Sequence, residues 1–146
     1  MATDLPSELV YSRESELVNE LEGMLVSSEN PFSHLTTACE FNYLEGKVDL
    51  IAANDAGELF SFEAKLKRWR TAVYQAYRNT SFSHYSYVVL PMQAAQHALK
   101  RRHEFEQRGV GLCAVSVAGI KVEILAVRKT PLRPWLTSTA IAYIKR

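Results

Sequence analysis

Three residues in one short stretch, residues 45–65, have side chains suited to hydrolytic chemistry. Asp49 interrupts an apolar run, and Glu63 and Lys65 interrupt a second run that follows it. Two carboxylates and an amine can together hold a hard divalent cation such as Mg²⁺ and activate a water molecule for phosphodiester hydrolysis. The alternative is that these side chains hold a charged partner without catalysing a reaction.

The two runs, residues 48–53 and 59–64, have the composition of a pair of β-strands. Between them stands Asn-Asp-Ala-Gly, which favours a tight turn and therefore predicts a hairpin. Because side chains alternate along a strand, Glu63 and Lys65 are expected to project from one face, about 6–7 Å apart along the chain. The opposite face is left to Phe60, Phe62 and Ala64.

A further carboxylate is predicted to face the core from the first helix. Residues 13–27 have the period of an amphipathic helix, with an apolar arc formed by Leu17, Leu21, Met24 and Leu25. Glu14 falls inside this arc, where a carboxylate is costly unless it is paired or bound to a cation. Glu14 therefore either joins the site or, being at the end of the helix, reaches solvent.

Charge divides the chain into two unlike halves. Residues 1–63 hold 13 acids and two bases, a net charge of −11, whereas residues 64–146 hold three acids and 15 bases, a net charge of +12. Clusters of lysine and arginine are the usual means of holding phosphates, so the basic half indicates a nucleic-acid partner. The alternative is that the two halves neutralise each other across the fold.

Length and composition predict one globular domain, residues 1–146, with an ordinary proportion of hydrophobic residues at 47%. The longest weakly polar stretch, residues 110–120, is too short to span a bilayer, and the N-terminus lacks the segments of a signal peptide. We expect a cytoplasmic protein without a membrane partner. Cys39 and Cys113 lack metal-binding spacing and are expected to be two buried thiols.

The other predicted elements surround the hairpin. A helix is expected over residues 68–80, with Trp69, Val73, Ala76 and Tyr77 on its buried stripe. Arg68, Gln75 and Asn79 share another face, which either delivers donors to the site or is solvated. The remaining expectations are strands at 37–44, 85–90, 110–118 and 120–128, a helix at 92–107, and a loop or tail at 129–146 anchored by Trp135.

This order of elements, with Asp49 followed by Glu63-Ala64-Lys65, resembles the PD-(D/E)xK nuclease superfamily over about residues 13–91. Within the superfamily, the pattern looks most like the small Holliday-junction resolvases. Gln75 matches a glutamine found on the second helix of RecB-like members. Two positions depart from the pattern, since Asn79 replaces the tyrosine four residues later and Val48 replaces a proline before Asp49.

The resemblance implies an α/β fold of restriction-endonuclease type, in which an αβββαβ core forms a central mixed sheet flanked by helices, with residues 92–128 added to it. It also implies roles for named residues. Asp49, Glu63 and the Ala64 carbonyl would bind Mg²⁺, Glu14 would bind through water or a second ion, and Lys65 and Gln75 would complete the catalytic set. The DNA backbone would be contacted by Lys67, Arg68, Arg70 and Arg78.

From residues and resemblance together, the expected function is a Mg²⁺-dependent endonuclease acting on DNA, with Mn²⁺ able to substitute. The chain shows no recognisable specificity module, so we expect a homodimer or a protein partner that confers specificity. The alternative is a nuclease fold that is catalytically silent or depends on a partner, and that only binds DNA or protein. A purely structural role would leave Asp49, Glu63 and Lys65 unexplained.

Overall fold

The computed structural model describes residues 11–27 and 29–146 of the chain. Up to the fourth strand, the elements follow the order that the sequence predicted. They are α1 (Glu14–Val26), β1 (Thr36–Tyr43), β2 (Gly46–Ala53), β3 (Leu59–Ala64), α2 (Trp69–Asn79), β4 (Tyr85–Pro91), α3 (Met92–Leu99), α4 (Arg102–Glu106), β5 (Gly111–Ser116), β6 (Gly119–Ile124) and α5 (Pro134–Lys145).

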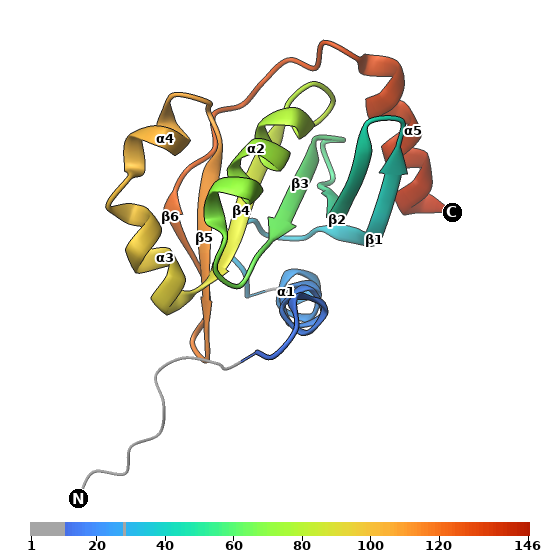
Figure 1. The fold of residues 1–146 in the computed structure, drawn as a ribbon. Helices are drawn as coiled ribbons and strands as arrows, with labels where there is room; N and C mark the ends of the chain where they lie inside the picture. Colours follow the sequence, from blue (N-terminus) through green and yellow to red (C-terminus); the bar gives the residue numbers. More distant parts are fainter. Residues whose placement is uncertain (1–10, 28) are drawn as a thin grey trace, which may run out of the picture.

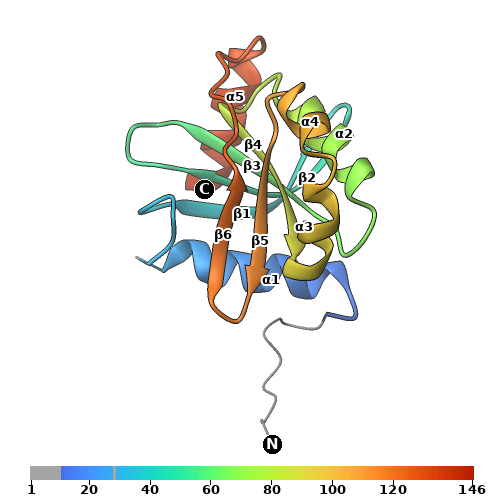
Figure 2. The ribbon, with the colours of Figure 1, turned by 90° about the vertical axis from the view of Figure 1, so that its left-hand side faces the viewer.

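The strands form one six-stranded sheet in the order β1-β2-β3-β4-β5-β6. The first three strands are antiparallel neighbours, β3, β4 and β5 are parallel, and β6 returns antiparallel to β5. One face of the sheet packs against α1 and the other against α2 to α5 (Figures 1 and 2). The predicted fold class is confirmed: a single α/β domain with a mixed sheet flanked by helices.

Alternation along β3 decides which side chains meet which helix. Phe60 and Phe62 face α1 and pack with its fully buried leucines, Leu17, Leu21 and Leu25. Each buried leucine contributes about 1.5–3 kcal/mol, so this layer holds α1 firmly on the sheet. The other face of β3 lies under α2 and α5, and Glu63 belongs to it.

The hairpin forms where it was predicted. Leu50 of β2 pairs with Phe62 of β3, and the register continues to Ala53 and Leu59 at the turn. Gly57 adopts a φ of 81°, a backbone conformation that side chains disfavour, and its N–H donates to the Asn54 carbonyl oxygen at 3.0 Å. The turn therefore sets the register that places Asp49 opposite Glu63.

Two predictions for the second half of the chain are wrong. The helix expected over residues 92–107 is broken into α3 and α4, and the tail expected over residues 129–146 contains α5. Pro134 occupies the first turn of α5, where proline is tolerated because its missing N–H would have no helical partner. Trp135 is 65% exposed and does not anchor the segment, which is held instead by buried Leu136, Ala140 and Ile144.

The buried stripe of α2 is rotated from its predicted position. Val73 and Ala76 are buried as expected, but Tyr77 is exposed and Asn79 is fully buried. The shift has a physical reason, because Asn79 has polar partners inside the protein and Tyr77 does not. Among residues 11–27 and 29–146, no helix is long and apolar enough to cross a membrane.

Candidate active site

Asp49 and Glu63 lie next to each other at the end of the β2–β3 ladder. The last paired residues are Leu50 and Phe62, and the two acids are the next residues along each strand. Beyond that pair, the N–H of Ala64 donates to Asp49 Oδ2 at 2.9 Å rather than to a backbone carbonyl of β2. The carboxylate of Asp49 thus takes over the role of a backbone acceptor where the strands separate.

β2 changes direction at Asp49. Val48 and Leu50 are two residues apart and would share a face in a regular strand, yet Val48 packs in the core under α5 and Leu50 in the core under α1. Glu40, which stands across from Asp49 in β1, has a φ of 57°. These irregularities set the Asp49 carboxylate at the seam between the two faces of the sheet.

Glu63 is an acid in a nearly dry environment. Its side chain is 1% exposed, and Asn79 Nδ2 donates to Glu63 Oε2 at 2.7 Å. Burial, and then the negative charge of Asp49, raise the pKa of Glu63 from its ordinary value of 4.5 to about 8. Two adjacent carboxyl groups therefore share a site in which one of them is protonated at neutral pH.

A relay of polar side chains orients the Asn79 amide. Arg78 Nε donates to the Tyr43 hydroxyl oxygen at 2.8 Å, and the Tyr43 hydroxyl donates to Asn79 Oδ1 at 2.8 Å. Because the oxygen of Asn79 is occupied by Tyr43, its NH₂ group is directed to Glu63. Gly46 makes room for the relay, since a Cβ there would lie 2.7–2.9 Å from the Arg78 guanidinium.

Lys65 connects the end of β3 to the start of α1. Its Nζ lies 3.7 Å from Glu14 Oε1, and the two side chains are 22% and 46% exposed. Glu14 thus reaches solvent from the end of the helix and is paired as well, which combines the two alternatives that the sequence left open. Lys65 N also donates to the Val89 carbonyl oxygen at 3.1 Å, so its backbone remains tied to β4.

A hollow of about 390 Å³ opens between α1 and the first two strands, beside this group. Glu14 and Asp49 both line it, together with Ser15, Val18, Asn19, Cys39, Glu40 and Lys47. Burial is the main cause that raises the pKa of Cys39 to about 11, so this thiol is neutral near pH 7. Cys113 is fully buried as predicted, whereas Cys39 is only partly so.

Gln75 lies one helical turn before Asn79 on α2, and its polar atoms are incompletely satisfied. The Oε1 atom is buried and has no hydrogen-bond partner among the described residues. A buried acceptor without a donor costs about 1–3 kcal/mol, which a bound water or ligand group could recover. Gln75 therefore offers a buried acceptor on α2 that is still free for a ligand.

The four predicted DNA-backbone contacts have different surroundings. Lys67 and Arg68 are exposed before α2, and neither forms an ion pair with any described residue. Arg70 is exposed but pairs with Glu104 at 3.1 Å. Arg78 is engaged in the relay described above and also donates to the Glu45 carbonyl oxygen at 3.3 Å. Lys67 and Arg68 thus remain available for a phosphate backbone, whereas Arg70 is paired with an acid and Arg78 is held by uncharged acceptors.

No group of three or more histidine, cysteine or acidic side chains is arranged to hold a metal ion within residues 11–27 and 29–146. The carboxyl pair of Asp49 and Glu63 would have to share its cation with backbone or water oxygens.

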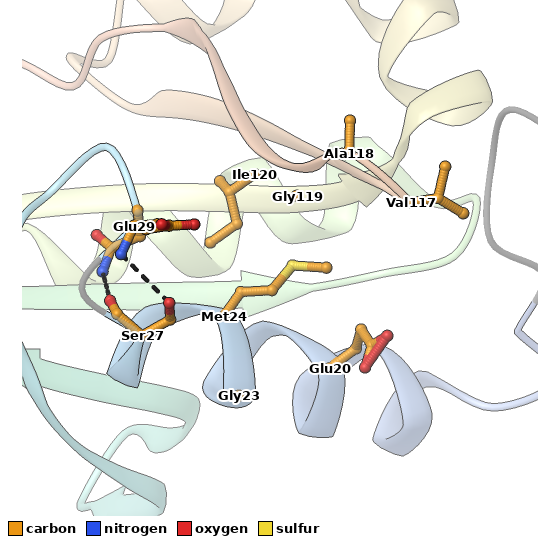
Figure 3. Close-up of a pocket in the computed structure, with 10 residues that line it drawn as sticks. Glu20, Gly23, Met24, Ser27, Glu29, Val117, Ala118, Gly119 and Ile120 are labelled. Atoms are coloured by element: carbon orange, nitrogen blue, oxygen red, sulfur yellow. Dashed lines mark hydrogen bonds between the residues drawn. The ribbon is translucent and has the colours of Figure 1, made fainter.

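A second hollow, of about 370 Å³, lies between α1 and the β5–β6 turn and contains none of the predicted site residues (Figure 3). Of the two hollows, only the one beside Glu14 and Asp49 is therefore lined by predicted metal-binding residues.

The sequence matches no family model and no curated protein. Among solved structures, the fold is similar to that of a protein of unknown function from Silicibacter pomeroyi. The two chains share 14% identity with a TM-score of 0.62, over 98% of this chain and 86% of the other. Similarity at this level shows the fold alone, and fold does not determine function, so the functional inference depends on the site.

Two members of the site were missed as candidates. For Asn79 the sequence predicts only a polar helix face that either serves the site or is solvated, and for Tyr43 it predicts only a position in a strand. One signal was available, because Asn79 stands one helical turn after Gln75 and shares its face. No sequence signal pointed to Tyr43, since its link to Asn79 spans 36 residues and depends on how α2 crosses the sheet.

Proposed function

We propose that this protein is a Mg²⁺-dependent nuclease that hydrolyses phosphodiester bonds in DNA. The observation that carries the proposal is the carboxyl pair of the half-buried Asp49 and the buried Glu63 at the point where β2 and β3 separate, with Lys65 two residues beyond Glu63. The proposal agrees with the resemblance of the same residues to the PD-(D/E)xK pattern. The protein is proposed to act in the cytoplasm.

The residues present fit a hard divalent cation. Asp49 and Glu63 offer oxygen ligands, and no lysine or arginine of the described residues forms an ion pair with either. A cation would offset both the burial and the repulsion from Asp49, which together raise the pKa of Glu63. The Ala64 carbonyl is the further ligand that the resemblance suggests. Bound there, Mg²⁺ or Mn²⁺ would supply charge stabilisation and a lowered pKa for a bound water.

The chain's own residues would position the water, stabilise the developing charge and hold the DNA. Lys65 would orient the attacking water or stabilise the negative charge that develops on the phosphate. Glu14 Oε1 lies 3.7 Å from Lys65 Nζ and would hold this amine in position. Gln75 Oε1 has no partner among the described residues and would accept a hydrogen bond from water. Lys67 and Arg68 supply positive charge for the DNA backbone.

A second candidate is a nuclease fold that binds DNA or protein but does not cleave alone. It is favoured by one observation, that Glu14 is paired with Lys65 and no third carboxylate joins Asp49 and Glu63 among the described residues. A homodimer or a specificity-giving partner could complete the site or bring two sites to two strands. Sedimentation with and without DNA distinguishes a monomer from these assemblies.

Cleavage of a panel of labelled DNA substrates tests the proposal. Linear duplex, nicked, branched and single-stranded DNA are each incubated with the protein in Mg²⁺, in Mn²⁺ or in EDTA. We expect cleavage of at least one substrate with either metal and none with EDTA. Binding without cleavage in every condition would support the second candidate, and cleavage that persists in EDTA would overturn the metal-dependent mechanism.

Replacing Tyr43 by phenylalanine tests whether the relay matters to the site. The change leaves Arg78 Nε and Asn79 Oδ1 without their shared partner, so we expect a loss of about 1–3 kcal/mol in the free energy of unfolding. Because Asn79 then no longer holds Glu63 in one orientation, cleavage should slow by about tenfold or more. Urea unfolding and cleavage rates measure the two effects.

Tyr143→Phe is the matched control for this change. The Tyr143 hydroxyl also bonds to β1, through the carbonyl oxygens of Cys39 at 3.0 Å and Glu40 at 3.3 Å, but it does not contact Asn79 or Glu63. We expect Tyr143→Phe to reduce stability and to leave the cleavage rate unchanged once the protein is folded. Equal losses of activity in the two variants would show that the relay has no specific role.

A further inference from the structure

α2 covers one face of the sheet (Figure 1), and two of its large aromatic side chains are exposed to solvent away from its buried stripe. Tyr74 and Tyr77 are 62% and 51% exposed, and residues three apart on a helix are neighbours on its surface. Neither hydroxyl has a hydrogen-bond partner within residues 11–27 and 29–146. Exposed tyrosines with free ring faces are typical of binding surfaces.

Arginines lie over two aromatic rings of α2, those of Tyr74 and Trp69. The Arg108 guanidinium lies 5.3 Å from the centre of the Tyr74 ring, and Arg70 lies in the same way 4.4 Å from the Trp69 ring. Both arginines are held by Glu104, Arg70 through the carboxylate and Arg108 through the backbone carbonyl. We refer to Arg70, Tyr74, Tyr77 and Arg108 as the α2 surface.

The charge around the α2 surface favours a polyanion. α2 contains no acidic residue, and no acid occurs in the sequence between Glu63 and Glu104. Exposed Lys100 and Arg101 follow α3 on the same side of the sheet, and Lys67 and Arg68 precede α2. This charge complements a phosphate backbone, and it would repel a basic protein partner.

We infer that the α2 surface binds unpaired nucleotides, whose bases stack on Tyr74 and Tyr77 while Arg70 and Arg108 contact the phosphates. Aromatic rings beside cations suit single strands because every base has a face that can stack. In an intact duplex those faces are covered by the neighbouring bases, so the same rings would have little to bind. The occupant is therefore single-stranded nucleic acid rather than duplex.

The same helix links this surface to the candidate active site. Asn79, on the other side of α2, donates to Glu63, and a helix with its side chains is about 10–12 Å across. The α2 surface and the carboxyl pair thus lie on opposite sides of one helix. If the chain is the nuclease proposed above, its substrate class is DNA with an unpaired segment beside the cleavage position, such as a flap or a branch.

Fluorescence anisotropy in EDTA tests the inference without requiring cleavage. A labelled single strand of about 12 nucleotides and a duplex of the same length are titrated with wild-type protein and with the Tyr74→Ala, Tyr77→Ala double variant. We expect the double variant to bind the single strand about five- to a hundredfold more weakly, with duplex binding unchanged. Changing both tyrosines to phenylalanine keeps the ring faces and should restore single-strand binding.

Trp135→Ala is the matched control, since Trp135 is an equally exposed aromatic residue on α5, outside the α2 surface. It should leave single-strand binding unchanged. Unaltered single-strand binding by the double alanine variant, or an equal loss in Trp135→Ala, would overturn the inference. Because no metal or activity enters this measurement, its result is separate from that of the cleavage assay, which alone decides the proposed nuclease function.

Discussion

Replacing Lys65 by alanine is expected to lower the rate of metal-dependent DNA cleavage by about a thousandfold or more. Its amine is the cationic group that follows Glu63 at the end of β3, and no other lysine or arginine of the described residues pairs with Glu14. The fold should persist, because Glu14 is half exposed and can be solvated when it loses its partner. Exposed ion pairs of this kind contribute about 0–1 kcal/mol.

Lys47→Ala is the control for the loss of a positive charge beside the same hollow. Lys47 lines that hollow with Asp49 but pairs with Glu40 at 3.5 Å. Single-turnover cleavage by both variants, with thermal unfolding to verify the fold, makes the comparison. Cleavage by Lys65→Ala at the wild-type rate, or an equal loss in Lys47→Ala, would contradict the role given to Lys65.

Glu63→Gln is expected to change activity and stability in opposite directions. Cleavage should fall to background, because the neutral amide cannot replace a carboxylate as a cation ligand. The metal-free protein should become more stable at alkaline pH, by roughly 2–4 kcal/mol, because the variant no longer buries a carboxylate beside Asp49. A residue that serves function at a cost in stability is typical of active sites.

The pH dependence follows from the direction of the pKa shift. Folding raises the pKa of Glu63 from 4.5 to about 8, so the folded state holds more protons between these two values. Its contribution to stability is complete below about pH 4.5 and is lost as the pH rises through about 8. The wild type should therefore lose stability relative to Glu63→Gln over this window.

Urea unfolding in EDTA between pH 5 and pH 9, about the window that the linkage sets, measures this difference. Glu40→Gln provides the control, since it also removes an acid, but an exposed one on the neighbouring strand. A constant difference in stability between wild type and Glu63→Gln across the range would contradict a protonated Glu63. Cleavage by Glu63→Gln at the wild-type rate would contradict the role of Glu63 as a cation ligand.

Much of the region around the site could be predicted because its signals are local. The turn at Gly57, the alternation along β3 and the leucine spacing of α1 each depend on residues close in sequence. Their periods determined which side chains face the core, and they placed Glu63 opposite the aromatic face. These are the same signals that singled out Asp49 and Glu63.

The predictions that were wrong depend on contacts between distant segments. Asn79 is buried because Tyr43 and Glu63 satisfy its amide, and neither partner is near it in sequence. The sequence does not predict α5 because Pro131 and Pro134 are typical of a loop, although Pro134 begins the helix. The apolar side of α5 is buried only by packing on β1 and β2, which are distant from it in sequence.

The most direct test of the account is the anomalous scattering of Mn²⁺ soaked into crystals of the protein. We expect a peak between the carboxylates of Asp49 and Glu63, near the point where the Ala64 N–H meets Asp49. Crystals of Asp49→Asn, soaked in the same way, should lack that peak. Wild-type crystals at saturating Mn²⁺ with no peak between these carboxylates would contradict the claim that the pair is a cation site.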